Sequence, residues 1–242
     1  MAITTAVTTL KVGTLQVETA TIVGTITLSG NATVTVTGAD ITGSPVAVSV
    51  AVLNGDTPNI VAIKMASAIN LNVNISAKYV ATAVGYDVVL TRLVPIANDA
   101  TLNIAYTNGT CAGLTPDATS VDTIAGVALA KLVDITNYPD LGASPSKLDT
   151  TDLTQPTYKT SELGLQEIPD LTFECNYVES TYDAITAMLL SLYYFSLEFG
   201  DSDGKFTWTG DISIFVNGAG VDEIRKMTVT TSTATPIEFS AT

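Results

Sequence analysis

Carboxylates are the most abundant side chains in this sequence that could do acid–base chemistry. The 242 residues include 24 Asp and Glu, two cysteines (Cys111 and Cys175) and no histidine. The absence of imidazole excludes Ser-His-Asp and Cys-His catalysis and histidine metal sites, and two cysteines are too few for a structural zinc site. Paired acids such as Glu174 and Glu179 could cleave a glycosidic bond only at a defined separation, which the sequence does not fix. We therefore predict no enzyme, and no catalytic, cofactor-binding or metal-binding residues.

Three further patterns have a simple structural interpretation. Asp201-x-Asp203-Gly204 begins like a calcium loop but lacks the later ligands, and Gly218-x-Gly220 lacks the third glycine and the helix of a dinucleotide site. Both patterns predict turns. The two cysteines are expected to be small buried thiols, since two cysteines in different parts of the chain make no disulfide framework.

The acidic composition argues against nucleic-acid binding. The formal net charge is −14, whereas a nucleic-acid binder needs Lys and Arg to neutralise phosphates. Residues 1–10 lack the basic and apolar segments of a secretory signal. The apolar runs are far shorter than the ~20 residues of a membrane helix. We expect a protein made without export and with no membrane partner.

Charge and aromatic residues divide the chain into two parts. Residues 1–130 hold 7 acidic and 4 basic side chains, and residues 131–242 hold 17 acidic and 6 basic ones. All six phenylalanines and the single tryptophan also lie in the second part. This shift predicts two domains with different roles.

The first part has the patterns of a β-rich domain with one helix. Threonine supplies 39 of the 242 residues, which favours strands. Alternation of apolar and polar residues predicts strands at 32–37, 45–52, 75–82, 86–93 and 100–106. Thr57-Pro58 predicts a helix start, with a helix to about Asn70 whose apolar face comprises Ile60, Ala62, Ile63, Ala66, Ala68 and Ile69. The small residues from 109 to 126 are interpreted as a tether.

The second part begins with a long segment, residues 136–169, that contains four prolines and predicts a functional loop. A strand is expected at 170–178, followed by a helix. Residues 180–183 resemble its capping box, and its buried face comprises Tyr182, Ile185, Leu189 and Leu192. A strand at 195–199, a turn at 201–205, a return strand, a turn at 217–220 and strands at 224–231 and 236–239 complete an antiparallel meander. The residues expected to face inward on the return strand are Phe206, Trp208, Ile212, Ile214 and Val216.

Several segments of this second part resemble the tail tube (major tail) proteins of long, flexible-tailed bacteriophages. They are KLVDI at 131–135, YPDLG at 138–142, GKFTWTG at 204–210 and VNGAGV at 216–221. The opening, MAITTA at 1–6 through LKVG at 10–13, is similar to the start of such proteins. Residues 14–126 resemble a β-rich module of phage structural proteins. We accordingly divide the chain into a first strand of the tube core (1–13), an inserted β-rich domain (14–126) and the tail tube core (127–242).

The resemblance implies a mainly β fold, with a sandwich-like or barrel-like tube core, one flanking helix and an inserted β-rich domain with one helix. It also implies a structural virion protein that self-assembles into stacked hexameric rings, with the long loop reaching the neighbouring ring. Its partners would be other copies, the tape measure protein in the lumen, other tail proteins, and DNA that passes during ejection without tight binding. Its location would be the tail tube of the virion, assembled in the host cytoplasm.

Two questions stay open at this stage. Part of the acidic surplus is expected to line the lumen, where repulsion would let the DNA backbone slide past. The alternative function is a cell-surface or carbohydrate-binding β module, suggested by the threonine-rich first part. Against it stand the missing export signal and the few aromatics in 14–126, which are Tyr79, Tyr86 and Tyr106.

Overall fold

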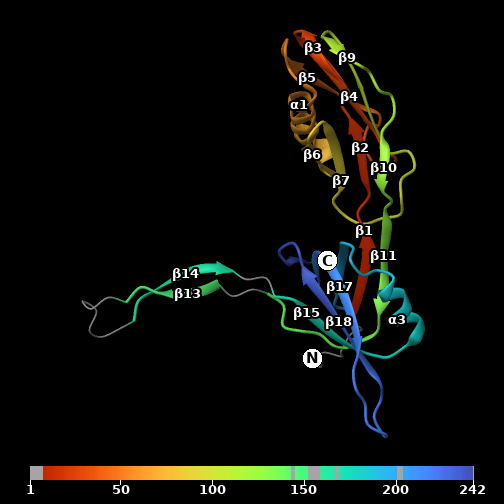
Figure 1. Ribbon diagram of the computed structural model, residues 1–242, viewed down its shortest axis with the longest axis vertical. Helices are drawn as coiled ribbons and strands as arrows, with labels where there is room; N and C mark the ends of the chain where they lie inside the picture. Colours follow the sequence, from red (N-terminus) through yellow and green to blue (C-terminus); the bar gives the residue numbers. More distant parts are fainter. Residues whose placement is uncertain (1–7, 143–144, 152–158, 167–168, 201–203, 242) are drawn as a thin grey trace. The chain divides into compact units, whose positions relative to one another are not determined.

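The computed structural model describes residues 8–142, 145–151, 159–166, 169–200 and 204–241. The chain forms two compact units. The continuous unit is Gly13–Leu129, and the split unit combines the residues up to Val12 with those from Ala130 onward. The sequence placed these boundaries after residues 13 and 126, so the two divisions differ by one and three residues. Within the described residues both units are mainly β, with 19 strands and three helices (Figure 1).

The continuous unit is built from three antiparallel sheets and two helices. Its sheets have the strand orders β10-β2-β7-β6, β5-β4-β8 and β3-β9. The elements are β2 (Val17–Thr21), β3 (Gly24–Leu28), β4 (Gly30–Thr37), β5 (Val46–Val52), α1 (Pro58–Leu71), α2 (Val73–Ser76), β6 (Tyr79–Val84), β7 (Asp87–Arg92), β8 (Asn103–Thr107), β9 (Ala112–Leu114) and β10 (Val121–Ile124).

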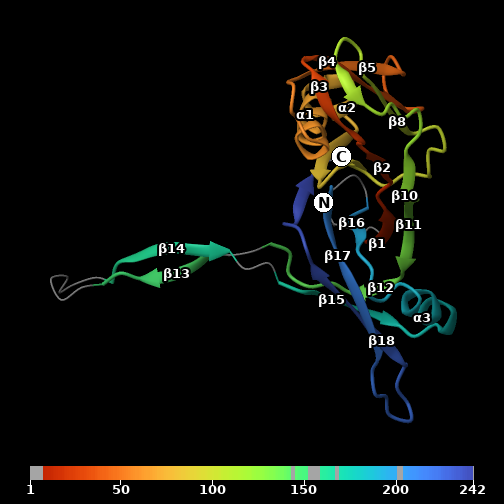
Figure 2. The same ribbon diagram turned by 45° about the horizontal axis from the view of Figure 1, so that its top comes forward.

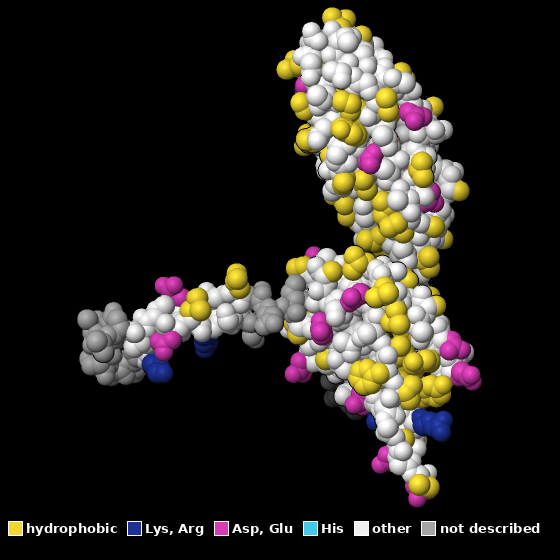
Figure 3. All heavy atoms as spheres, in the orientation of Figure 1, with side chains coloured by type: hydrophobic (Ala, Val, Ile, Leu, Met, Phe, Trp, Pro, Cys, Tyr) yellow, Lys and Arg dark blue, Asp and Glu magenta, His cyan; other side chains and the backbone are white. Residues whose placement is uncertain are grey.

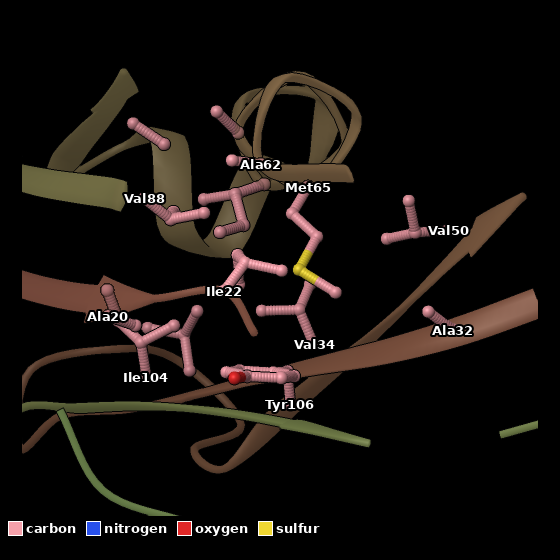
Figure 4. Packing of buried hydrophobic residues seen from close by; sticks show 14 of the residues in the cluster. Ala20, Ile22, Ala32, Val34, Val50, Ala62, Met65, Val88, Ile104 and Tyr106 are labelled. Atoms are coloured by element: carbon pink, nitrogen blue, oxygen red, sulfur yellow. The ribbon is translucent and has the colours of Figure 1, made fainter. Parts of the chain in front are cut away.

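One hydrophobic core lies between these sheets, and α1 closes it. The helix packs on β5, β6 and β7. In Figure 4, Met65 of α1 extends toward Val34 of β4, and Tyr106 of β8 lies beyond Val34. All three side chains are at most 1% exposed. At ~25 cal/mol per Å² of buried apolar surface, a core of this kind can stabilise a unit of this size by itself.

The strands predicted at 32–37, 45–52 and 86–93 are confirmed by β4, β5 and β7, but the predicted face of α1 is wrong in part. The buried residues are Val61, Ala62, Met65, Ala66 and Ile69, which repeat at i, i+1, i+4, i+5 and i+8. The helix carries two overlapping apolar stripes. The sheets cover the stripe that contains Val61 and Met65, so Ile60 and Ile63 of the other stripe are left 41% and 52% exposed.

Two other predictions for this unit need correction. The strand expected from residue 75 begins only at Tyr79, because Asn72 accepts a hydrogen bond from the Asn74 backbone (3.1 Å) and starts the single turn α2. The stretch interpreted as a tether contains β9 and β10, which pair with β3 and β2. These strands belong to the folded unit.

The split unit has one eight-stranded sheet, a two-stranded hairpin and one helix. The sheet order is β11-β1-β16-β17-β18-β15-β12, with β19 paired to β17, and β13 pairs with β14. The elements are β1 (Thr9–Thr14), β11 (Val127–Val133), β12 (Ile135–Asn137), β13 (Pro145–Asp149), β14 (Ser161–Gln166), β15 (Leu171–Asn176), α3 (Glu179–Thr186), β16 (Tyr193–Glu198), β17 (Lys205–Val216), β18 (Lys226–Thr233) and β19 (Glu238–Ser240).

This sheet is curled. Its order runs from β11 at one end to β12 at the other, yet only Asp134 separates these two strands in the chain. The two edges must therefore approach each other where β11 ends, as in a sandwich or barrel whose chain turns a corner between sheets. The meander β16-β17-β18 lies side by side in both ribbon views (Figures 1 and 2).

An aromatic stack fills the inner face of the curled sheet. Trp208 lies between Phe195 and Phe173, with ring centroids 5.7 Å and 6.1 Å from its own. Its indole N–H donates to the Thr231 hydroxyl at 3.1 Å. All four side chains are at most 1% exposed. This core is separate from that of the continuous unit.

Several predictions for the split unit are wrong in detail. Residues 136–169 are not wholly irregular, since β12, β13 and β14 lie within or overlap this range; residues 152–158 lie outside the described residues. Helix α3 ends at Thr186, so Leu189 and Leu192 lie beyond it and are 37% and 67% exposed. Ser180 lies inside the helix and caps nothing, because the N-cap is Val178. Val216 is 44% exposed, near the tip of its hairpin.

Candidate assembly surfaces

The residues singled out for chemistry are not brought together. Glu174 lies on β15 and pairs with Lys226 at 3.4 Å, whereas Glu179 begins α3. Gly220 lies in an exposed turn and donates its backbone N–H to Glu223 at 2.8 Å. Asp201 and Asp203 lie outside the described residues. Within the described part of the chain, no three His, Cys, Asp or Glu side chains form a group that could hold a metal ion.

The two cysteines are buried, free and in different units. Burial raises the pKa of the Cys175 thiol to about 11 and raises that of Cys111 as well. Because the thiolate is the reactive form, both side chains are inert at neutral pH in the folded protein.

A polar cluster in the continuous unit ties a loop to the sheet. The Arg92 guanidinium is ion-paired with Asp40, donates to the Tyr79 hydroxyl at 2.8 Å and lies 5.2 Å from the centroid of the Tyr79 ring. Gln16 and Asp99 exchange two hydrogen bonds of 3.0 and 2.9 Å beside it. Arg92 and Gln16 are 6% and 0% exposed. The cluster is filled by its own side chains, so it has a structural role.

Glu18 of β2 is a buried carboxylate whose pKa is raised. It is 2% exposed, its Oε1 accepts from the Ser120 hydroxyl at 2.5 Å, and its Oε2 has no hydrogen-bond partner. Asp122 lies directly across the strand pair. Burial raises the pKa of Glu18, the Ser120 hydrogen bond opposes this, and the Asp122 carboxylate adds to it. Because Glu18 is 2% exposed and its carboxyl is closed off from solvent, we assign it a structural role rather than a catalytic one.

The split unit presents a face of hydroxyl groups on the side of the sheet opposite the aromatic core. In the strand registers Thr172 lies opposite Thr230, and Thr230 opposite Ser213. The two threonine hydroxyls are 3.4 Å apart. In the adjoining row Asp211 lies opposite Ser232. We call these five residues the hydroxyl face.

Two of the cations beside this face are neutralised. Lys226 on β18 pairs with Glu174 at 3.4 Å, and Lys11 on β1 pairs with Glu198 at 2.5 Å. Asp211 forms no ion pair with a described residue. Lys205, on the same side of β17, lies opposite Glu198 and forms no ion pair with a described residue. The five residues of the hydroxyl face carry no cation themselves and include one carboxylate, so the face itself is neutral to weakly acidic.

Two hairpins of the split unit expose apolar side chains. On β13–β14, Leu148, Leu163 and Leu165 are 57%, 73% and 90% exposed. At the β17–β18 hairpin, Val221 and Ile224 are 103% and 73% exposed. Figure 3 shows hydrophobic side chains at the surface of both hairpins. Exposed apolar groups clustered in this way mark contact sites for other proteins.

Two hollows in the described part of the split unit contain no catalytic set. A cavity of about 450 Å³ beside the β17–β18 turn is lined by Asn217, Gly218, Glu223, Ile224 and Lys226. Another, of about 310 Å³, lies beside α3, and its only carboxylate is Asp134, which pairs with Lys131. Neither hollow brings two carboxylates together.

The sequence reasoning missed the hydroxyl face and the exposed turn after α3. The alternation in TVTTST at 228–233 is a signal that could have revealed the face. None of the described helices is long and apolar enough to span a bilayer. No protein-family model and no curated protein matches the chain.

Proposed function

We propose that this protein is a structural subunit of a phage tail tube, which self-assembles into stacked, hexameric rings. The observation that carries the proposal is the curled sheet of the split unit. One side of the sheet is packed with aromatic residues, and the hydroxyl face on the other side carries no cation of its own. This is the wall that a DNA channel needs, since an unpaired basic surface would hold the phosphates.

Under this proposal, fewer acidic side chains would line the lumen than the sequence led us to expect. Glu174 and Glu198 beside the hydroxyl face are ion-paired, and only Asp211 is left. Smooth passage of DNA would then rest mainly on neutral hydroxyls, which exchange hydrogen bonds readily with water. The tape measure protein would fill the same channel before ejection.

The exposed apolar hairpins support assembly. Burying a fully exposed leucine side chain stabilises a contact by ~1.5–3 kcal/mol. Contacts between these hairpins and other copies would therefore be favourable. The continuous unit would be displayed on the tube as an inserted domain. As a carbohydrate-binding module it has little support, because Tyr79 and Tyr106 are 1% exposed and only Tyr86, at 61%, is available for stacking on a sugar.

Electron microscopy of the purified protein tests the proposal. We expect rings or tubes with a central channel and sixfold rotational averages. A protein that stays dispersed at every concentration and binds to a glycan array would instead favour the carbohydrate-binding module. In a virion preparation, antibodies to the continuous unit should decorate the tail along its length.

A further inference from the structure

The turn after α3 contains a leucine, Leu190, that does not pack in the core and has a backbone conformation unfavourable for leucine. Leu190 is 99% exposed and has φ +66°. It is the only residue other than glycine with a positive φ in the described part of the chain. Glycine and asparagine adopt this conformation at the lowest cost, and strain of this kind concentrates where a side chain is presented for a function.

An acidic stripe on α3 leads to this leucine. Glu179, Asp183 and Ala187 follow one another at helical spacings of four residues, and all three are exposed. The Ala187 backbone N–H continues the helical hydrogen bonds to Asp183, so the spacing places these three on one side. Leu190 lies three residues further on, in the exposed turn that follows the helix. Neither Glu179 nor Asp183 pairs with a described cation.

The β13–β14 hairpin carries the complementary features on one face. Lys147 lies opposite Leu163 in the strand register, so these two side chains share a face, and Leu165 follows at an irregularity in the pairing. Lys147 is exposed and forms no ion pair with a described residue. The hairpin face is thus apolar with a positive charge, whereas the α3 stripe is acidic with an apolar end.

We propose that the Lys147–Leu163 face of one copy binds the Glu179–Asp183 stripe and the adjoining Leu190 turn of a second copy, with Leu190 as the buried anchor. This inference rests on the proposed self-assembly and names the surface of the second copy to which the β13–β14 hairpin binds. The contact joins two different patches, so it is heterologous. Repeated contacts of this type generate closed rings or extended filaments, as a tube requires.

The full-length variant Leu190→Asn tests the anchor. Asparagine suits the positive φ and removes no buried surface, so the isolated subunit should melt at the same or a higher temperature than wild type. Assembly should weaken by about tenfold or more in the critical concentration, measured by sedimentation and negative-stain imaging. Leu71→Asn is the matched control, because Leu71 is 84% exposed but lies at the end of α1 in the continuous unit. It should assemble like wild type.

Charge reversal tests the pairing. Asp183→Lys and Lys147→Glu should each weaken assembly, and the double variant should recover most of it, as coupled residues do in a double-mutant cycle. Wild type that never assembles would refute the proposed function. Wild type that assembles alongside an equally competent Leu190→Asn would refute only this interface. A lower melting temperature for monomeric Leu190→Asn would show that the hairpin docks within its own chain, which also overturns the interface.

Discussion

Replacing Glu18 with glutamine should stabilise the continuous unit at neutral pH. The wild-type carboxylate is 2% exposed, and its Oε2 has no partner. Because burial raises its pKa above the ordinary 4.5, folding favours the protonated form. The stability contributed by protonated Glu18 is complete below the unfolded pKa and is lost as pH rises through the folded pKa. Glutamine mimics the protonated acid at every pH.

The size of the effect follows from the same linkage. Each unit by which the pKa is raised costs about 1.4 kcal/mol of stability above the folded pKa. A buried, partly unsatisfied polar group costs about 1–3 kcal/mol. We therefore expect Glu18→Gln to gain about 1–3 kcal/mol at pH 8. The gain should correspond to about 4 °C or more in the melting temperature of a unit of this size and should vanish below about pH 4.

Calorimetry of the full chain, with tryptophan fluorescence in parallel, can assign the change. The only tryptophan, Trp208, lies in the core of the split unit, so the calorimetric transition that leaves its fluorescence unchanged belongs to the continuous unit. Only this transition should shift. Asp56 and Asp99 have lowered pKa values because hydrogen bonds outweigh the effect of burial. Wild type and Glu18→Gln therefore both lose stability in acid. This shared loss cancels when the unfolding free energy of one protein is subtracted from that of the other. A difference that is the same at pH 4 and pH 8, or that grows in acid, would refute the reasoning.

Three other predictions concern the two cores and the insertion. Ile185→Ala should destabilise the split unit by about 2–5 kcal/mol because Ile185 is 0% exposed, whereas Leu189→Ala, at a side chain beyond the helix, should cost less than about 1 kcal/mol; tryptophan fluorescence in urea measures both. Cys175, with its pKa near 11, should react with a thiol reagent at pH 8 only as fast as the protein unfolds, and prompt labelling of the native protein would contradict its burial. A chain in which Gly13 is joined to Val127 through an Asn-Gly turn should still form tubes, with a smaller outer diameter in negative-stain images; tubes of unchanged diameter would show that the continuous unit is part of the wall.

The longest alternating segments were predictable because their pattern and their packing agree. Ala32 to Thr37 alternates between small apolar and threonine side chains, and β4 lies in the middle of its sheet with its apolar side in the core. Phe195 and Leu197 likewise point into the core of the split unit as predicted. In such strands, shifting the pairing by one residue would expose every apolar side chain, so the sequence specifies one solution.

Other features depend on contacts that local patterns do not encode. Ile60 and Val61 are equally good candidates for the buried face of α1, and only the position of the sheets decides between them. The short strand Ala112–Leu114 has almost no β pattern and exists because β3 offers it a partner. Leu189 fits the helical period, but the helix ends three residues before it.

The surfaces proposed for assembly were the least predictable, since they are defined by what the fold leaves uncovered. The sequence reveals that Leu190 is apolar but not that it is exposed with a left-handed backbone. It reveals many threonines but not that Thr172, Ser213 and Thr230 align across three strands. Such alignments follow from strand register, which is fixed by pairs far apart in the chain.

The route of the chain between the units explains how a domain of this size can interrupt the sheet. The chain leaves the sheet through β1 and re-enters it through β11, and these strands are neighbours in the sheet order. Their arrows run in opposite directions in Figures 1 and 2. Two neighbouring antiparallel strands need only a two-residue turn between them, so the continuous unit occupies the place of a hairpin turn. Because each unit has its own core, neither needs the other to bury its apolar residues.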